Sequence, residues 1–213
     1  MKANHVAEST LVELLNKPGL DCPICSALSL STKSWLEATL SNLMHNFESR
    51  GKLLRGGLCT AHKKLLIELA TSEFNVGALS LSMLLDEMLP VQLRTLEKRK
   101  VISGKSCYLC EFERQTSQRY VDTFKEFFNL LEGKKLYENS EHIICIDHSA
   151  KLLSSMKAKT REWFLEVQNV KFTALHQLLK NYMKKHDHRS KEPFGEERDS
   201  WKTLAKLIGE LKT

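Results

Sequence analysis

The residues best suited to chemistry in this chain are six cysteines and two histidines, which fall into four short motifs. In order along the 213 residues they are Cys22-Pro-Ile-Cys25, Cys59-Thr-Ala-His62, Cys107-Tyr-Leu-Cys110 and Cys145-Ile-Asp-His148. The pattern is CxxC followed by CxxH, written twice. Three thiolates and one imidazole are the ligand set of a closed tetrahedral zinc site. The chain therefore carries the ligands for two such sites.

The two copies of the pattern are related by a nearly constant offset. The second CxxC follows the first by 85 positions, and the second CxxH follows the first by 86. A single inserted residue accounts for the difference, so we predict an internal duplication. We expect one unit over residues 1–213, in which 20–100 and 105–185 are repeats with a metal site each and 186–213 form a charged loop and a last helix.

Three chemistries compete for these side chains. Disulfides leave Cys59 and Cys145 without local partners, and the polar segment Met1–Thr10 lacks the apolar stretch of a secretory signal. A thioredoxin-like redox motif needs a βαβ context that this leucine-rich chain does not show. We therefore interpret all eight residues as metal ligands. The predicted ligands are Cys22, Cys25, Cys59, His62, Cys107, Cys110, Cys145 and His148.

The metal and the pairing of the motifs stay open at this point. Thiolates bind both zinc and iron–sulfur clusters, and imidazole replaces cysteine in some clusters. We expect two Zn²⁺ ions because Cys3His is far commoner for structural zinc, with Cys3His-ligated iron–sulfur clusters in a redox or sensor protein as the alternative. Pairing CPIC with CTAH is the local arrangement, whereas a swapped arrangement joins each CxxC to the CxxH of the other copy.

The elements that carry the motifs are expected to be helices. The chain has 35 leucines, 15 valines plus isoleucines, 9 glycines and 4 prolines, which favours helices over strands. Apolar spacings of three and four predict helices over about residues 31–50 and 76–100, the second kinked or interrupted at Pro90, and a loop covers 133–141. We predict an all-α protein of about eight helices. Cys59 and Cys145 are each expected near a helix N-terminus, where the helix dipole favours the negative charge of a thiolate.

The motifs together resemble those of an uncharacterised family of bacterial and archaeal proteins, known only as a domain of unknown function. The resemblance rests on CPxC, LCxxH after a glycine-rich turn, and a tail similar to the family's KHDxR and GEExDSW signatures, here Lys185–Arg189 and Gly195–Trp201. It covers about Leu20 to Ile208. The second copy departs from it, with Ile143-Ile144 before Cys145 where the family has GLC. The resemblance implies a helical, cytoplasmic, metal-binding protein, and it does not indicate which activity, if any, the protein has.

The charged tail is a second candidate site. One interpretation is a site for a small anion or a partner; another, which we favour, is a loop fixed by salt bridges and a helix cap. A further metal site at His186 and His188 is a weaker third interpretation. The candidate residues of the tail are His186, Asp187, Arg189, Glu196, Asp199 and Trp201.

The charge of the chain and the sequence motifs that it lacks indicate which kinds of partner and activity to expect. The net charge of +6 is spread along the chain, so an unidentified protein partner is expected and nucleic acid is not favoured. No apolar run approaches the roughly 20 residues that cross a bilayer, so we expect a cytoplasmic protein with no membrane partner. Phosphate-binding, dinucleotide-binding and hydrolase signatures are missing. A closed four-ligand site also leaves no position for a catalytic water, which favours a non-catalytic scaffold.

Overall fold

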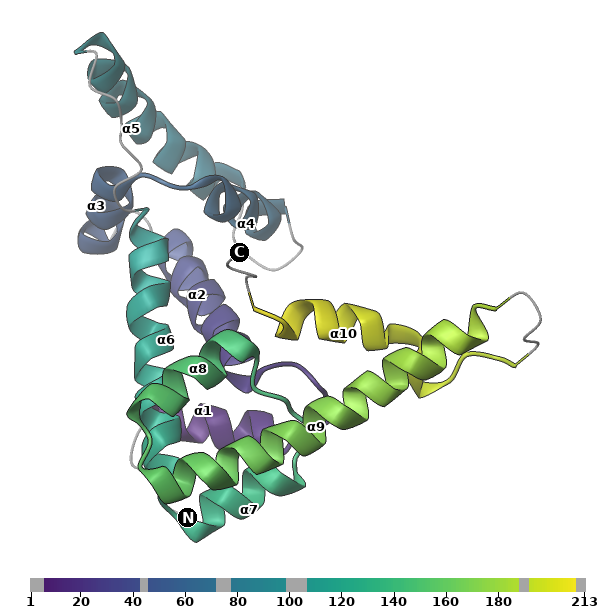
Figure 1. Ribbon diagram of the computed structural model, residues 1–213. Coiled ribbons are helices and arrows are strands. Elements are labelled where there is room, and N and C mark those ends of the chain that lie inside the picture. The colour runs from purple at the N-terminus through teal and green to yellow at the C-terminus, as the bar shows by residue number, and fades with distance from the viewer. Residues whose placement is uncertain (1–5, 43–45, 72–77, 99–106, 188–191, 210–213) are drawn as a thin grey trace. The chain divides into compact units, whose positions relative to one another are not determined.

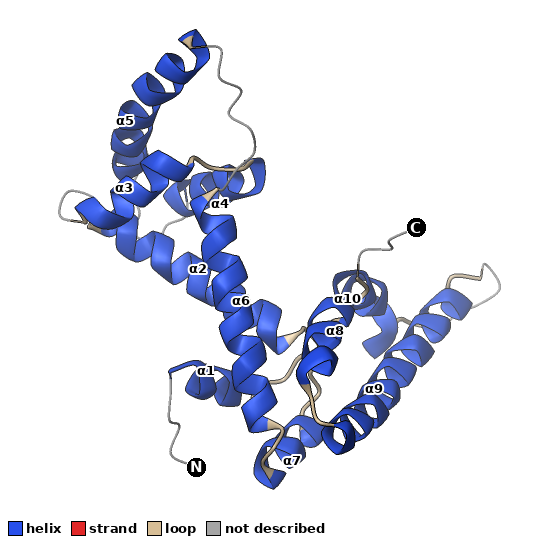
Figure 2. Cartoon of the chain, turned by 60° about the vertical axis from the view of Figure 1, so that its left-hand side comes forward, coloured by secondary structure: helices blue, strands red, loops and turns tan. Residues whose placement is uncertain are grey.

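The structure, a computed structural model, describes residues 6–42, 46–71, 78–98, 107–187 and 192–209. Its described residues form helices and loops and contain no strand (Figure 2), which confirms the all-α prediction. The described elements are α1 (Val6–Leu15), α2 (Pro23–Ser41), α3 (Phe47–Gly56), α4 (Thr60–Thr71), α5 (Ala78–Glu97), α6 (Tyr108–Phe127), α7 (Leu131–Asn139), α8 (Ile146–Ser155), α9 (Ala158–Lys185), the 3₁₀-helix η1 (Glu196–Asp199) and α10 (Ser200–Leu207).

The chain forms two compact units, each with its own core. Unit 1 comprises Met1–Ala27 and Ser117–Thr213, and unit 2 comprises Leu28–Thr116. The boundaries fall inside α2 and α6, so each of these continuous helices gives its first part to one unit and its second part to the other. The division therefore cuts across the predicted repeats instead of between them.

Aromatic side chains form the core of unit 1. The Phe128 ring lies 5.3 Å from that of Tyr137, 5.1 Å from that of Trp163 and 5.7 Å from that of Phe164, centroid to centroid. Such pairs contribute about 0.5–1.5 kcal/mol each beyond the burial of their area. They join Phe128, the residue that follows α6, to α7 and to the first half of α9, which with 28 residues is the longest described helix (Figure 1).

Leucine side chains form the core of unit 2. They come from the second half of α2, from α3, α4 and α5, and from the first turn of α6, and each is at most 1% exposed. The fully buried leucines are Leu36, Leu40, Leu53, Leu66, Leu84 and Leu109.

Two predicted helices differ from those observed. The single helix expected over residues 31–50 is two, because α2 ends at Ser41 and the Asn46 side chain caps α3 by accepting the Ser49 N–H at 3.2 Å. The helix expected to be kinked or interrupted at Pro90 is not interrupted there, since α5 continues through it. Pro90 and Asp86 are exposed, so water can satisfy the carbonyl that loses its helical partner.

The loop expected over residues 133–141 is also wrong, because α7 occupies Leu131–Asn139. Gly133 is buried in its first turn, where a β-carbon would lie 2.2 Å from the carbonyl oxygen of Phe127. The residue that suggested a loop therefore permits a close approach between α7 and the end of α6.

We predict that Gly133→Ala destabilises unit 1 by about 1–3 kcal/mol, because the methyl group overlaps backbone that cannot move aside. The measurement is chemical denaturation followed by near-ultraviolet circular dichroism, which reports the aromatic core. Gly51→Ala in α3 is the matched control, since its β-carbon meets only the flexible Arg55 guanidinium at 3.2 Å. The control is expected to be neutral or stabilising by up to about 1 kcal/mol. Equal effects of the two substitutions would contradict the close approach.

Candidate metal centres

All four motifs lie at the start of a helix. The first cysteine of each directly precedes the first helical residue, and its carbonyl accepts the first intrahelical hydrogen bond, as an N-cap residue does. The second ligand, three positions on, lies in the first turn on the same face. The capping bonds are Ser26 N–H to Cys22 O at 3.0 Å, Lys63 to Cys59 at 2.9 Å, Glu111 to Cys107 at 3.3 Å and Ser149 to Cys145 at 2.8 Å.

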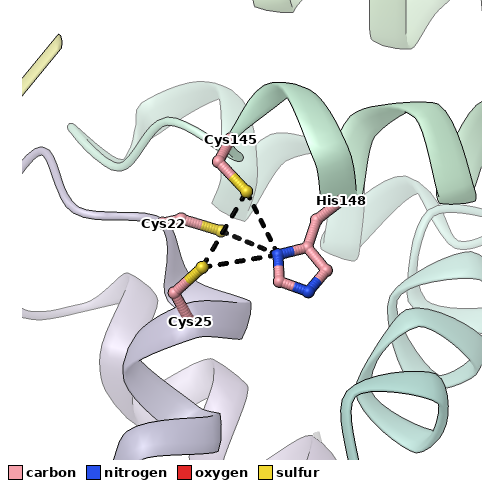
Figure 3. A group of neighbouring side chains, drawn as sticks. All are labelled: Cys22, Cys25, Cys145 and His148. Carbon is pink, nitrogen blue, oxygen red and sulfur yellow. Dashed lines mark hydrogen bonds between the residues drawn. The ribbon is translucent and has the colours of Figure 1, made fainter. Parts of the chain in front are cut away.

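The structure brings the eight predicted ligands together in two groups of four, and each group joins motifs of different repeats. Centre A is Cys22, Cys25, Cys145 and His148, and centre B is Cys59, His62, Cys107 and Cys110. In each centre the ligand atoms all lie within 4.8 Å of one another. Figure 3 shows the two cysteines at the start of α2 facing the cysteine and histidine at the start of α8. The arrangement is thus the swapped one, and the local pairing of CPIC with CTAH is not found.

The length of α2 explains why the local pairing fails. This helix of 19 residues is about 28 Å long at 1.5 Å per residue. Its CxxC is at the N-terminal end in unit 1, whereas Leu36 and Leu40 near its other end pack in the core of unit 2, which holds α4 and the first CxxH. The two motifs of one repeat are therefore held in different units.

The separations within the two centres are similar. In centre A, His148 Nδ1 lies 3.7, 3.4 and 3.1 Å from the sulfurs of Cys22, Cys25 and Cys145, and the sulfurs of Cys25 and Cys145 are 3.8 Å apart. In centre B, His62 Nδ1 lies 3.1, 3.3 and 3.5 Å from the sulfurs of Cys59, Cys107 and Cys110. The Cys110 and Cys59 sulfurs are 3.7 Å apart. Each group could hold one metal ion.

The far nitrogen of each histidine has a partner on α6. His148 Nε2 lies 2.9 Å from Ser117 Oγ, and His62 Nε2 lies 3.0 Å from Glu113 Oε1. Thr32 Oγ1 donates to the same Glu113 oxygen at 3.2 Å. A proton held on Nε2 leaves the Nδ1 lone pair directed at the sulfurs, which is how outer hydrogen bonds orient a ligating imidazole. Sequence reasoning missed these outer partners.

The thiols of each centre differ in acidity. Burial raises the pKa of Cys22 to about 12, and burial with the neighbouring thiols raises the pKa of Cys110 to about 12. The His62 backbone N–H lowers the pKa of Cys59 to about 7, and hydrogen bonds from Cys22 and Cys25 lower the pKa of Cys145. Three adjacent thiolates need a cation, so a metal would displace protons on binding and be held less tightly as the pH falls.

A buried polar network fixes the segment before Cys145. The Gln168 side-chain amide donates to the Ile144 carbonyl at 2.8 Å and to Ser149 Oγ at 2.6 Å, and its oxygen accepts the Tyr137 hydroxyl at 2.7 Å. The Ile144 N–H donates to the same tyrosine oxygen at 3.2 Å. Gln168 of the long helix α9 therefore fixes the backbone of Ile144, the residue directly before the predicted ligand Cys145.

His142 supports centre A without being a ligand. Its buried ring contacts the Leu14 carbonyl oxygen through Nε2 and the Asp21 carbonyl oxygen through Nδ1, each at 2.8 Å. Asp21 directly precedes Cys22, and His142 lies three positions before Cys145. The ring thus ties together the two chain segments that enter the centre.

The tail residues have separate neighbours. The His186 ring packs on Tyr182 and Phe194, with centroids 4.5 and 5.0 Å away. Asp199 pairs with Lys202 at 2.7 Å, Trp201 is 47% exposed, Glu196 lines a cavity, and Asp187 follows the end of α9. Arg189 and His188 lie outside the described residues, so the HxH metal site is not tested.

The buried contact of the tail is made by Glu197, which belongs to the charged tail but is not one of its six candidate residues. Its Oε1 accepts the Gly195 N–H at 2.8 Å and pairs with Lys185 Nζ at 2.9 Å. These bonds lower the pKa of Glu197 to about 2. The contact holds η1 against the end of α9.

The fold and the centres define an all-helical protein with two Cys3His groups built at helix N-termini. The chain belongs to a family of unknown function, DUF6062, whose model matches residues 6–213. This agrees with the resemblance to a domain of unknown function. No curated protein and no solved structure shows a significant match. None of the described helices is long and apolar enough to cross a membrane.

We predict that removing an outer partner weakens metal binding at one centre only. Ser117→Ala is expected to lower the affinity of centre A, and Glu113→Ala that of centre B, by about tenfold to a hundredfold. Competition with a chelator measures both affinities. Glu111→Ala is the matched control, since this α6 carboxylate pairs with Arg114 and contacts neither histidine. Loss of affinity in the control, or at both centres together, would argue against separate outer partners.

We also predict that centre B releases its metal first. In centre A, Cys22, Cys145 and His148 are buried and only Cys25 is exposed. In centre B, only His62 is buried, Cys59 and Cys107 are half-buried, and Cys110 is exposed. A maleimide or a chelator should therefore reach centre B sooner. The rates are compared in two variants, Cys145→Ser, which keeps only centre B intact, and Cys59→Ser, which keeps only centre A. Equal rates, or faster release from centre A, would refute this prediction.

Proposed function

We propose that the protein binds two Zn²⁺ ions, one in each Cys3His centre. The observation that carries the proposal is the spacing of the ligand atoms. For Zn–S of about 2.3 Å and Zn–N of about 2.0–2.1 Å at tetrahedral angles, neighbouring sulfurs are about 3.8 Å apart, and sulfur and nitrogen about 3.6 Å. One sulfur pair in each centre, at 3.8 and 3.7 Å, matches the sulfur–sulfur edge, and the nitrogen–sulfur separations run from 3.1 to 3.7 Å, close to or shorter than the nitrogen–sulfur edge.

The same spacing favours a single ion over an iron–sulfur cluster. A cluster distributes its protein ligands over several irons, so its ligating atoms stand farther apart than those that share one ion. Here all four ligand atoms of each centre lie within 4.8 Å. Iron–sulfur chemistry in a redox or sensor protein is therefore the alternative outcome of the experiment below.

The role we propose for the ions is to hold a non-catalytic, cytoplasmic scaffold together. Cys25 and Cys145 are 120 residues apart in sequence, and Cys110 and Cys59 are 51 apart. In the chain-entropy description of a covalent cross-link, closing a loop of about 100 residues stabilises a fold by about 4–5 kcal/mol. Four protein ligands also fill a tetrahedral ion, as in structural sites. We propose that this scaffold serves a protein partner.

Metal content with paired substitutions tests the proposal. Protein purified without air is expected to hold two zinc ions per chain and no acid-labile sulfide. Cys22→Ser should remove one ion, and adding Cys145→Ser should remove no more, because both residues serve centre A. Adding Cys59→Ser to Cys22→Ser should remove both ions. Elemental analysis of the variants measures each outcome.

Two results would contradict different parts of the proposal. If Cys22→Ser with Cys59→Ser kept one ion while Cys22→Ser with Cys145→Ser kept none, the ligands would be paired within the repeats. Brown protein that contains iron and sulfide would refute zinc and support the alternative. Circular dichroism of each variant checks that it remains helical.

A further inference from the structure

Unit 1 contains a cavity that takes no part in either metal centre. It has a volume of about 560 Å³ and lies against the middle of α9, a size typical of small-molecule sites. Much of its wall is apolar, and its polar residues are three glutamates, a serine and one lysine. The residues that line it are Leu20, Glu138, Ser140, Glu141, Ile143, Val170, Lys171, Ala174, Leu175, Leu178 and Glu196.

Lys171 is the one cation of this lining, and its ammonium group has an unusual environment. Its amine donates to the Ser140 carbonyl oxygen and lies 4.8 Å from the centroid of the Tyr137 ring. Among the described residues, no carboxylate oxygen lies within 4.0 Å of it to form a salt bridge. The residue also lines a second hollow of about 330 Å³ beside Trp163.

Partial burial makes this amine less basic than a surface lysine. Burial lowers the pKa of Lys171 to about 8, although the charge of Glu141 acts in the opposite direction. At pH 7.5, about a quarter of such amines are neutral, against about one in a thousand for a lysine with an ordinary pKa. A neutral amine has the free electron pair that a nucleophile requires.

The charge around the cavity selects the kind of ligand. Glu138, Glu141 and Glu196 line it together with a single lysine, so the local field disfavours an anion such as a carboxylate or a phosphate. The apolar side chains of Val170, Ala174 and Leu178 lie on one face of α9 because their spacing is four. A neutral molecule with an apolar body and a polar, electrophilic end satisfies both features.

We propose that the cavity binds small apolar aldehydes and that Lys171 forms an imine with them. The amine nitrogen attacks the carbonyl carbon, and a C–N bond forms as the carbonyl oxygen takes up a proton. The oxygen leaves as water when the second N–H proton is lost, so amine and aldehyde give imine and water without an oxidant or a reductant. The Glu138 and Glu141 carboxyl groups line the same cavity and can carry these protons.

Reductive trapping tests this proposal in the full-length protein. Hexanal and cyanoborohydride are added at pH 7.5, and peptide mass spectrometry measures the alkylation rate of each lysine. Lys171 is expected to react at least about tenfold faster than Lys180, an exposed lysine on the same helix. Its rate should rise through about pH 8 and then level off, because the amine is by then neutral. An equal rate, or one still rising near pH 10, would overturn the proposal.

Two substitutions and one control test the reactive amine and the cavity separately. Lys171→Arg should abolish the fast labelling and leave circular dichroism unchanged, and Lys180→Arg should leave the labelling at Lys171 as it was. Ala174→Phe fills the cavity, so it should slow labelling by hexanal more than labelling by acetaldehyde. If Ala174→Phe affects neither aldehyde while the protein stays folded, the cavity does not bind the aldehyde and the proposal fails.

Discussion

The charge of three thiolates at one point is the constraint on which the rest of the structure depends. Each centre partly balances this negative charge by bringing the N-termini of two helices together. These are α2 and α8 at centre A, and α4 and α6 at centre B. The positive ends of the helix dipoles face the sulfurs, and each first cysteine is also the residue that caps its helix. The proposed cation supplies the remaining charge. Ligand chemistry and helix initiation therefore use the same residues.

Helices α2 and α6 each contribute residues to both units. Each helix carries a CxxC in its first turn, and its second part carries side chains that serve the other unit. On α6, Cys110 is a ligand of centre B, Glu113 orients the histidine of the same centre, and Ser117 orients the histidine of centre A. One helix thus positions groups at both centres, and its two parts belong to different units.

The sequence was sufficient for the eight residues that gather into two Cys3His groups and for the helical class, because the cysteine and histidine types and a leucine-rich composition are local properties. It was not sufficient to show which CxxC motif pairs with which CxxH motif. Periodicity shows which face of a helix is apolar, but it does not show which other helix covers that face. Two available signals were missed. Pro23 after Cys22 is a favoured first helical residue, and Thr32 and Ser117, the hydroxyls near the histidines, are related by the 85-residue offset. Glu113, which contacts both Thr32 and His62, has no such counterpart. The residue 85 positions before it is Leu28, which has no carboxylate.

The discontinuity of unit 1 has a consequence for synthesis on the ribosome. Cys22 and Cys25 leave the ribosome well before Cys145, which follows Cys25 by 120 residues. At about 5–20 residues per second, a nascent chain exposes that CxxC for about 6–24 s before its partners appear. Centre B closes a span of 45 to 51 residues, so its ligands are complete while unit 1 is still unfinished. A metal ion taken up during synthesis would therefore find a complete ligand set first at centre B.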